Sequence, residues 1–245
     1  MTTDEVRSDH SAVLVTGSSG YIGGLLVEEL AERDFCETLV AGDISLPPED
    51  ERLDGVEYVE LDIRSERVRE VLEEHDIDVV VHLAAIVSPK PGDTREFLYD
   101  VDVNGTRNVL ESCLAAGVRR FVYTSSGAAY GYHPDQSGVL HEDDPLRGNE
   151  EFAYAHHKKL VEQMLADWRE DHPELEQVIL RVSTILGPEV DNQITAIFER
   201  PVILGLQGSE SPFCIIWDRD VVECLIYGIN SEKTGVYNLT GDGVV

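Results

Sequence analysis

Short apolar runs rich in β-branched residues alternate with longer amphipathic stretches through the first two-thirds of the chain. Runs such as 12–16 and 78–83 have the length of buried strands, and the stretches between them have helical spacing. Strands that alternate with helices form a parallel sheet covered on both faces, and right-handed crossovers then wind the sheet in two directions. The sequence therefore predicts an α/β fold with a doubly wound parallel sheet.

The same patterns predict where the elements and domains lie. The expected strands are 12–16, 38–42, 56–61, 78–83, 119–124 and 178–182, with a short strand at 214–217. The expected helices are 22–33, 65–74, 96–116, 151–170 and 219–230. The rhythm changes near residue 187, which predicts a sheet domain over 10–186 and a partial, small C-terminal lobe over 187–245 that holds substrate. Within that lobe we expect 214–230 to pack back on the first domain.

The charge of the chain excludes several classes of partner. With 48 Asp and Glu against 19 Lys and Arg, the net charge is −29, which repels nucleic-acid phosphates and anionic membranes. No apolar stretch reaches the length of a membrane span, and the polar N-terminus does not resemble a secretory signal. The four cysteines are far apart in the sequence, which predicts reduced thiols in a cytoplasmic protein.

The basic residues include few lysines. Only Lys90, Lys158, Lys159 and Lys233 are present, and many carboxylates with few lysines is a pattern typical of high-salt cytoplasms. We therefore expect a salt-adapted protein, with an acidic protein from an ordinary bacterium as the alternative.

A glycine-rich turn follows the first expected strand. The segment is Thr16-Gly17-Ser18-Ser19-Gly20-Tyr21-Ile22-Gly23. Gly17 permits the tight turn, Gly20 lets a pyrophosphate approach the backbone, and Gly23 lets the helix pack close to the sheet. The helix N-terminus adds free N–H groups and positive dipole charge for an anion. Together these features predict a dinucleotide-binding turn.

An acidic residue stands where such folds bind the adenosine ribose. Asp43 follows the second expected strand, 20 residues after Gly23. Its carboxylate would accept hydrogen bonds from ribose hydroxyls and repel a 2′-phosphate, which favours NAD over NADP.

The spacing Gly-x-x-Gly-x-x-Gly resembles that of the extended short-chain dehydrogenase/reductase family, which includes NAD-dependent sugar-nucleotide epimerases and dehydratases. Other segments resemble the motifs of this family in the family's order. They are Asp62-Ile63, His82-Leu83-Ala84-Ala85, 103–110, 123–131, 142–146, Tyr154-Ala155-His156-His157-Lys158, 181–188 and 218–221. The resemblance implies a Rossmann domain, NAD as the cofactor and a homodimer paired through the helices 96–116 and 151–170. On those helices we expect exposed apolar side chains at Val109, Leu160, Val161 and Met164.

The resemblance also assigns roles to residues. It implies that Ser126, Tyr154 and Lys158 are catalytic. It implies cofactor contacts by Gly17, Ser19, Gly20, Tyr21, Ile22, Gly23, Asp43, Asp62, Ile63, Leu83, Ala84, Ala85, Asn104, Ser125, Tyr154 and Lys158. Tyr154 and Lys158 are four residues apart, so their side chains share one face of a helix, and we expect the ammonium to lower the pKa of the phenol.

Other polar residues are weaker candidates. Tyr130 either touches substrate or only packs, and His156 and His157 are expected on a solvated helix face. His82 is expected to be packed and hydrogen-bonded. No His, Cys and Asp cluster has metal-ligand spacing, so no metal is expected.

The chain departs from the family pattern where a substrate diphosphate would bind. Thr184 stands in place of an asparagine, Phe213 in place of an arginine, and Asp102 in place of an asparagine. We include Ser126, Tyr130, Thr184 and Phe213 among the substrate-facing residues, and expect a small substrate with little charge rather than a sugar nucleotide.

These observations predict an NAD-dependent oxidoreductase or epimerase that transfers a hydride at a hydroxyl or carbonyl carbon of a sugar or other small molecule. One alternative is a sugar-nucleotide 4-epimerase or dehydratase. The other is a dinucleotide-binding module without turnover.

Overall fold

The computed structural model describes residues 11–136, 138–190 and 213–243. In these ranges the chain forms a seven-stranded sheet in the order β3-β2-β1-β4-β5-β6-β9, and all neighbouring strands are parallel. Its strands are β1 (Ser11–Thr16), β2 (Cys36–Asp43), β3 (Val56–Glu60), β4 (Val79–His82), β5 (Arg120–Ser126), β6 (Glu176–Val182) and β9 (Gly235–Leu239). β7 (Thr184–Leu186) and β8 (Ile215–Trp217) form a second sheet of two strands.

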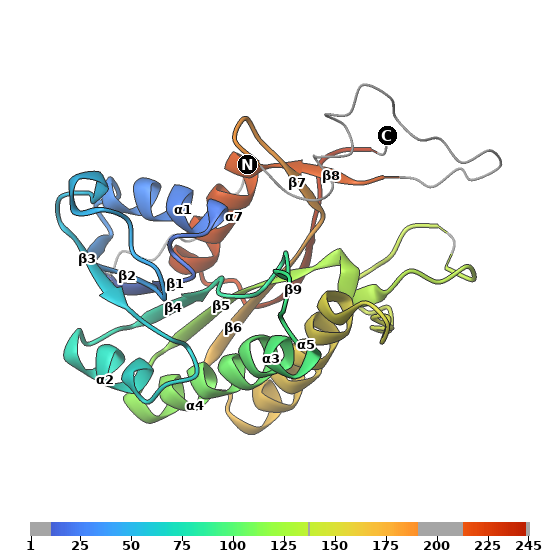
Figure 1. Ribbon diagram of the computed structural model, residues 1–245, viewed down its shortest axis with the longest axis horizontal. Helices are drawn as coiled ribbons and strands as arrows, with labels where there is room; N and C mark the ends of the chain where they lie inside the picture. The colour runs from blue at the N-terminus through green and yellow to red at the C-terminus, as the bar shows by residue number, and fades with distance from the viewer. Residues whose placement is uncertain (1–10, 137, 191–212, 244–245) are drawn as a thin grey trace.

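Helices cover both faces of the large sheet, with α1 and α7 on one side and α2 to α5 on the other (Figure 1). They are α1 (Tyr21–Ala31), α2 (Arg67–Glu74), α3 (Arg95–Tyr99), α4 (Thr106–Ala116), α5 (Ala153–Asp171) and α7 (Asp218–Asn230). Three short helical segments are η1 (Glu49–Glu51), the π-helix η2 (Asp100–Gly105) and η3 (Gly127–Tyr130). This arrangement confirms the predicted doubly wound α/β fold.

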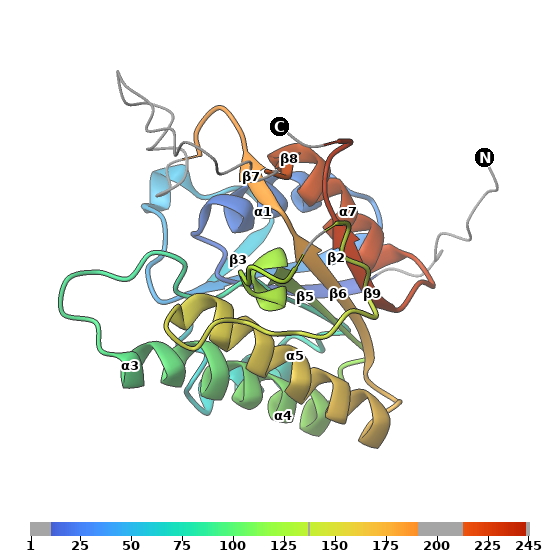
Figure 2. The same cartoon turned by 90° about the vertical axis from the view of Figure 1, so that its right-hand side faces the viewer.

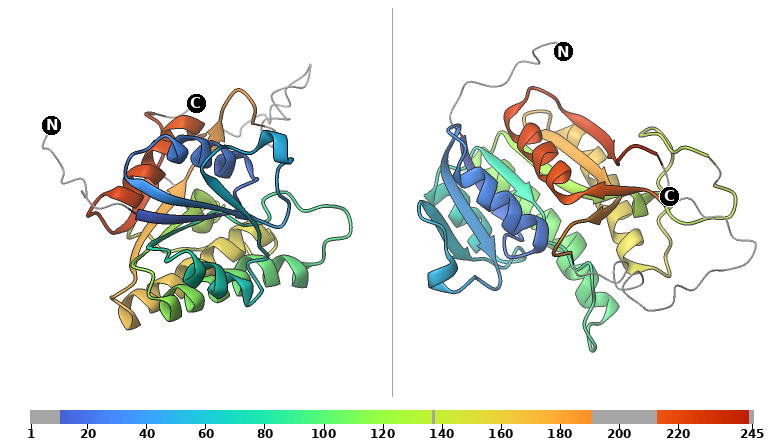
Figure 3. Two further views of the ribbon diagram at one scale, coloured as in Figure 1. Left: turned by 90° about the vertical axis from the view of Figure 1, so that its left-hand side faces the viewer. Right: turned by 90° about the horizontal axis from the view of Figure 1, so that it is seen from above.

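Each face of the sheet has its own apolar core. On one face α2, α4 and α5 pack against the strands, and α4 and α5 lie side by side beneath the sheet (Figure 2). On the other face α1 and α7 pack together, with Leu26 and Leu30 of α1 in the same buried cluster as Val221 and Leu225 of α7. The left view of Figure 3 shows the two helix layers with the sheet between them.

The direction of winding reverses between β1 and β4. From β1 the chain moves outward through β2 to β3, and from β4 it moves the other way through β5 to β6. Loops that leave the carboxyl ends of β1 and β4 therefore lie next to each other, where open α/β sheets bind ligands. These loops hold the glycine turn and residues 83–86.

The structure agrees with the expected strands of the first 182 residues to within two residues at each end. The helix expected over 96–116 is interrupted by η2, whose π-helical turns separate α3 from α4. β7 and β9 were not expected. β9 pairs with β6 at the edge of the large sheet, and α7 packs on that sheet, while β7 and β8 stand apart. A substrate-holding role for 187–245 stays a prediction, and 191–212 lie outside the described residues.

The expected exposed apolar positions on the pairing helices are wrong. Val109, Val161 and Met164 are buried in the core under α4 and α5, and Leu160 packs against that core. They face the sheet because each is on the inner face of its helix. The large apolar side chains that are exposed in this region are Phe97, Tyr99 and Phe152.

Candidate active site

The glycine turn is packed against the neighbouring loop without room for side chains. Gly17 has φ of +74°, and a Cβ there would lie 2.6 Å from the backbone nitrogen of Ala84. A Cβ at Gly23 would lie 2.1 Å from the carbonyl oxygen of Gly17. α1 begins directly after Gly20, and no side chain caps its first N–H groups. These groups point to the loop side, where an anion can bind them.

Asp43 lies at the end of β2, beside this turn. Its carboxylate accepts hydrogen bonds from the backbone nitrogens of Ser19 and Ser45, each at 3.1 Å. The Ser19 hydroxyl in turn donates to the carbonyl of Ser45 at 2.6 Å. Asp43 is therefore fixed next to the glycine turn with part of its surface exposed, as a ribose-binding acid requires.

Asp62 and Ile63 follow β3 at the same edge of the sheet. Asp62 forms a two-pronged ion pair with Arg64, in which Nη2 and Oδ2 are 2.6 Å apart, and hydrogen bonds from Arg64 hold the pKa of the carboxyl below its usual value. Ile63 is buried against Gly105 of η2. Asn104 donates to Asp100 on the outer side of η2, and it does not line the cavity that holds Tyr154 and Lys158.

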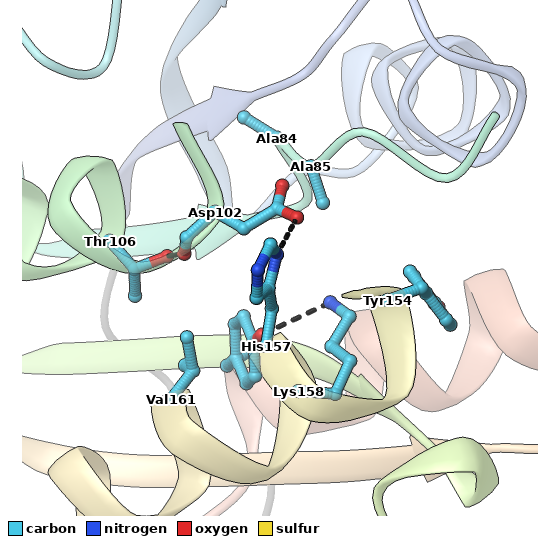
Figure 4. A pocket seen from close by; sticks show the side chains of 9 residues that line it. Ala84, Ala85, Asp102, Thr106, Tyr154, His157, Lys158 and Val161 are labelled. Carbon is cyan, nitrogen blue, oxygen red and sulfur yellow. Dashed lines mark hydrogen bonds and ion pairs between the residues drawn. The ribbon is translucent and has the colours of Figure 1, made fainter. Parts of the chain in front are cut away.

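Tyr154 and Lys158 project from the first turns of α5 into a small cavity (Figure 4). Its lining residues are Ala84, Ala85, Asp102, Thr106, Tyr123, Tyr154, His157, Lys158 and Val161. Lys158 is buried, and its Nζ donates to the hydroxyl of Tyr123 at 3.0 Å and to the carbonyl of Thr124 at 2.7 Å. The same Nζ lies 5.7 Å from the centre of the Tyr154 ring.

The expected lowering of the Tyr154 pKa by Lys158 is not found. Burial raises the pKa of Tyr154 to about 12, and a hydrogen bond with Ser126 offsets this only in part. The reason is that the ammonium is directed to β5 rather than to the phenol oxygen. Burial lowers the pKa of Lys158 to about 8, against the opposing charges of Asp102 and Glu162.

The two serines at the end of β5 have different surroundings. Ser126 caps η3 by accepting from the backbone nitrogen of Ala128 at 3.1 Å, and its hydroxyl also reaches Tyr154. The buried hydroxyl of Ser125 instead donates to the carboxylate of Glu162. The side chain of Ser126 is thus the one directed to Tyr154.

Tyr130 belongs to a buried polar network. Its hydroxyl accepts a hydrogen bond from Nη1 of Arg181 at 2.6 Å and lies 2.7 Å from Oδ1 of Asn238. Arg181 also pairs with Glu162 of α5. The hydroxyl is thus engaged within the protein, and a contact of Tyr130 with substrate stays a prediction.

Two residues of the cavity, Asp102 and His157, form a pair that the sequence did not predict. His157 was expected on a solvated face, but it is buried, and its Nδ1 lies 2.8 Å from Oδ2 of Asp102. The expectation is wrong because α3 and η2 pack over this side of α5. His156 is the half-exposed histidine of the two. No spacing rule signals such a pair, because its members are 55 residues apart.

The remaining residues singled out in the sequence lie elsewhere. His82 is fully buried and hydrogen-bonded to Thr16 and Thr106. Thr184 is in β7, where its nitrogen donates to the carbonyl of Cys214, and neither it nor Phe213 lines the cavity. Within the described ranges no cluster of three or more His, Cys, Asp or Glu side chains could hold a metal, and no helix could cross a membrane.

Several known proteins are similar to this chain in sequence or in fold. An uncharacterized protein of Mycobacterium tuberculosis is 26% identical over 237 residues, which cover 95% of this chain and 63% of that protein. The chain thus spans under two-thirds of this relative. A UDP-glucose 4-epimerase of Klebsiella pneumoniae is 37% identical over 131 residues, covering 50% of this chain and 94% of that protein.

Among solved structures, the Thermus thermophilus UDP-glucose 4-epimerase in complex with NAD has a TM-score of 0.78 and 26% identity, covering 96% of this chain and 79% of that one. Residues 13–239, which include the glycine turn, Tyr154 and Lys158, match the NAD dependent epimerase/dehydratase family. The match spans nearly the whole chain, and the chain therefore belongs to the NAD dependent epimerase/dehydratase family.

Proposed function

We propose that this protein is an NAD-dependent oxidoreductase or epimerase that transfers a hydride at a hydroxyl or carbonyl carbon of a sugar or other small molecule. One observation carries the proposal. Ser126, Tyr154 and Lys158 converge at the carboxyl end of β5, beside the loop 83–86 that contacts the glycine turn. The loop 83–86 thus borders both the glycine turn and Tyr154 with Lys158, which supports a dinucleotide and an acid/base group acting at the same end of the sheet.

The residues at this crevice fit NAD. A Cβ at Gly17 or Gly23 would fill the narrow space at the turn, and the first N–H groups of α1 suit a pyrophosphate. Asp43 would accept hydrogen bonds from the adenosine ribose, and Asp62 and Ile63 would border the adenine. Leu83, Ala84 and Ala85 would lie along the dinucleotide. When bound, the nicotinamide supplies the hydride acceptor and donor.

The chain's own residues would manage the proton and orient the substrate. Ser126 would hold the substrate oxygen, and Tyr154 would exchange its proton with that oxygen. A phenol with a pKa of about 12 is protonated at neutral pH, so this arrangement favours proton donation to a carbonyl oxygen. To remove a proton from an alcohol, Tyr154 must first become a phenolate, which the Lys158 ammonium would stabilise. At neutral pH Lys158 is largely charged.

Substitution of Tyr154 by Phe tests this function. The variant keeps the ring but lacks the exchangeable proton, so turnover should fall by about two to four orders of magnitude while NAD affinity is kept. Nicotinamide absorbance would be followed with simple sugars, uronates, hydroxysteroids and sugar nucleotides. Tyr58→Phe, on β3, is the matched control. Equal turnover in the parent and Tyr154→Phe proteins would refute the role of Tyr154.

A sugar-nucleotide 4-epimerase is the second candidate, favoured by relatives that are named UDP-glucose 4-epimerase. Phe213 and Thr184 offer little to a diphosphate. The Asp102 carboxylate is satisfied by His157 and by the backbone nitrogen of Ile86, so it opposes an anion less than an unpaired acid would. Calorimetry of the NAD-loaded protein with UDP-glucose and with glucose distinguishes the two substrate classes. NAD binding without turnover of any compound would instead support a binding module.

We further propose a cytoplasmic homodimer. All four cysteines are free thiols, which supports a reducing compartment. The exposed aromatic side chains of Phe97, Tyr99 and Phe152 lie on or beside α3 and α5, and their contact with water favours a covered face.

A further inference from the structure

Asp102 and His157 form a buried acidic–basic pair at the wall of the cavity. Their side chains are 8% and 6% exposed, and the Nδ1–Oδ2 distance is 2.8 Å. The other carboxylate oxygen of Asp102 accepts from the backbone nitrogen of Ile86 at 2.9 Å. One carboxylate therefore joins the loop after β4 to α5, as Figure 4 shows for the link to His157.

The pair lies in the cavity of Tyr154 and Lys158. His157 precedes Lys158 in α5, and both members of the pair line the same cavity as the acid/base residues. Asp102 lies in the π-helix η2, a kind of segment that frequently occurs at functional sites. The hydroxyl of Thr106 donates to the carbonyl of Asp102 at 2.7 Å, which anchors its backbone.

The charged groups around the pair come from several elements. Lys158 of α5 and Tyr123 of β5 line the same cavity, and the charge of Glu162 acts on both of these residues. Tyr99 of α3 meets the His157 ring edge-on at 5.7 Å, and His82 of β4 is held neutral by burial, which lowers its pKa to about 3. Arg95, Glu96 and Asp100 border the outer side of His157. Among the residues that line the cavity, Asp102 is the one that carries a carboxylate.

We propose that Asp102 and His157 are a positioning pair for the hydride-transfer site, which fixes α5 against the loop 83–86 and sets the charge beside Tyr154 and Lys158. This rests on the proposed function for the roles of Tyr154 and Lys158. The negative charge of Asp102 favours the protonated forms of both, because it repels a phenolate and attracts an ammonium. The hydrogen bond from His157 keeps that carboxylate in place.

Removing the charge while keeping the shape tests the electrostatic part. In Asp102→Asn the phenolate of Tyr154 should form at a pH lower by about one unit, since a buried neighbouring charge has been lost. The titration is followed by phenolate absorbance in the parent protein and in Asp102→Asn. The absorbance of the same protein carrying Tyr154→Phe is subtracted in each case, so that only Tyr154 is measured. Circular dichroism confirms that the protein stays folded. Asp100→Asn, in the same π-helix but on its outer side, is the control and should not shift the titration.

The positioning part is tested at His157. His157→Leu removes the N–H donor and should lower kcat at least tenfold with little change in the KM for NAD. His157→Asn places an amide N–H near the position of Nδ1 and should restore most of this loss. A His157→Asn protein as inactive as His157→Leu would overturn the positioning role.

The outcomes separate this proposal from the proposed function. If turnover depends on Tyr154 but its titration is unshifted in Asp102→Asn, the electrostatic role of the pair is overturned and the proposed function stands. Turnover that survives Tyr154→Phe refutes the proposed function, while the titration still measures the charge of the pair.

Discussion

Arg181 of β6 and Glu162 of α5 form an ion pair inside the protein, with Nη2 and Oε2 2.7 Å apart and only 6% and 2% of the side chains exposed. Glu162 lies one turn after Lys158, and it also accepts from Ser125 at the end of β5. The pair therefore holds α5 against β5 and β6, the two strands that border the proposed site.

Glu162→Gln should destabilise the protein by about 3 kcal/mol or more, because Arg181 would keep a buried charge without its counter-charge. Chemical denaturation gives the free energy of unfolding. Glu70→Gln breaks an exposed pair with Arg67 and should cost at most about 1 kcal/mol. A similar decrease in the free energy of unfolding in both variants would contradict a larger contribution from the buried pair.

Lys158 should make stability depend on pH. The pKa of Lys158 is about 8 in the folded protein, against an ordinary value of 10.5 that we expect in the unfolded chain. The unfolded chain therefore binds the proton more tightly. Stability contributed by this residue therefore rises between pH 8 and 10.5, by about 3 kcal/mol over the whole window. The difference in unfolding free energy between parent and Lys158→Met should grow accordingly. A constant difference across this range would show that Lys158 is not buried as a cation.

Asp43 should select NAD over NADP. In Asp43→Asn the side chain keeps its size and an acceptor oxygen but loses the charge that repels a 2′-phosphate. NADP affinity should then rise by about tenfold, or 1.4 kcal/mol, while NAD affinity falls. Calorimetry with both cofactors measures the ratio. If the parent protein binds NAD and NADP with equal affinity, Asp43 does not select the cofactor.

Added salt should raise the melting temperature. The net charge of −29 is self-repulsive, and ions screen repulsion between exposed carboxylates beyond about 10 Å at 0.1 M. Scanning calorimetry in increasing KCl measures the trend. A flat or falling melting temperature would speak against salt adaptation.

The homodimer predicts a light-scattering mass of twice 27.2 kDa at working salt. Replacing Phe97 and Phe152 by Ser should shift the mass toward the monomer, because both exposed rings would be covered in a dimer. Val139→Ser, which removes an apolar side chain that is 82% exposed and outside both helices, is the matched control. A parent protein of monomer mass would exclude the dimer.

The alternation of apolar runs predicted the large sheet well, because buried parallel strands such as β4, with four fully buried residues, need continuous apolar sequence. β9 lacked this signal. It is an edge strand, its sequence includes Asn238, and Tyr237 is exposed. Its place depends on pairing with β6, which no local pattern encodes.

Local motifs predicted where the glycine turn, Asp43 and the Tyr154–Lys158 pair lie, because each motif depends on spacing along one segment, while the roles of these residues stay predictions. The Asp102–His157 pair could not be predicted in this way. Its contact depends on a π-helical segment that re-aims one side chain and on tertiary packing that buries the other. The direction of the Lys158 ammonium toward β5 is likewise set by tertiary structure.

The packing of α1 on α7 has a consequence for synthesis on the ribosome. Leu30 and Leu225 belong to one buried cluster, and Tyr21 donates to Asp218 at 2.5 Å although 197 residues separate them. At about 5–20 residues per second, about 10–40 s pass between the emergence of α1 and that of α7. Throughout that delay the apolar side of α1 lacks its partner, so nascent chains should need chaperone protection until α7 has emerged and packed against α1.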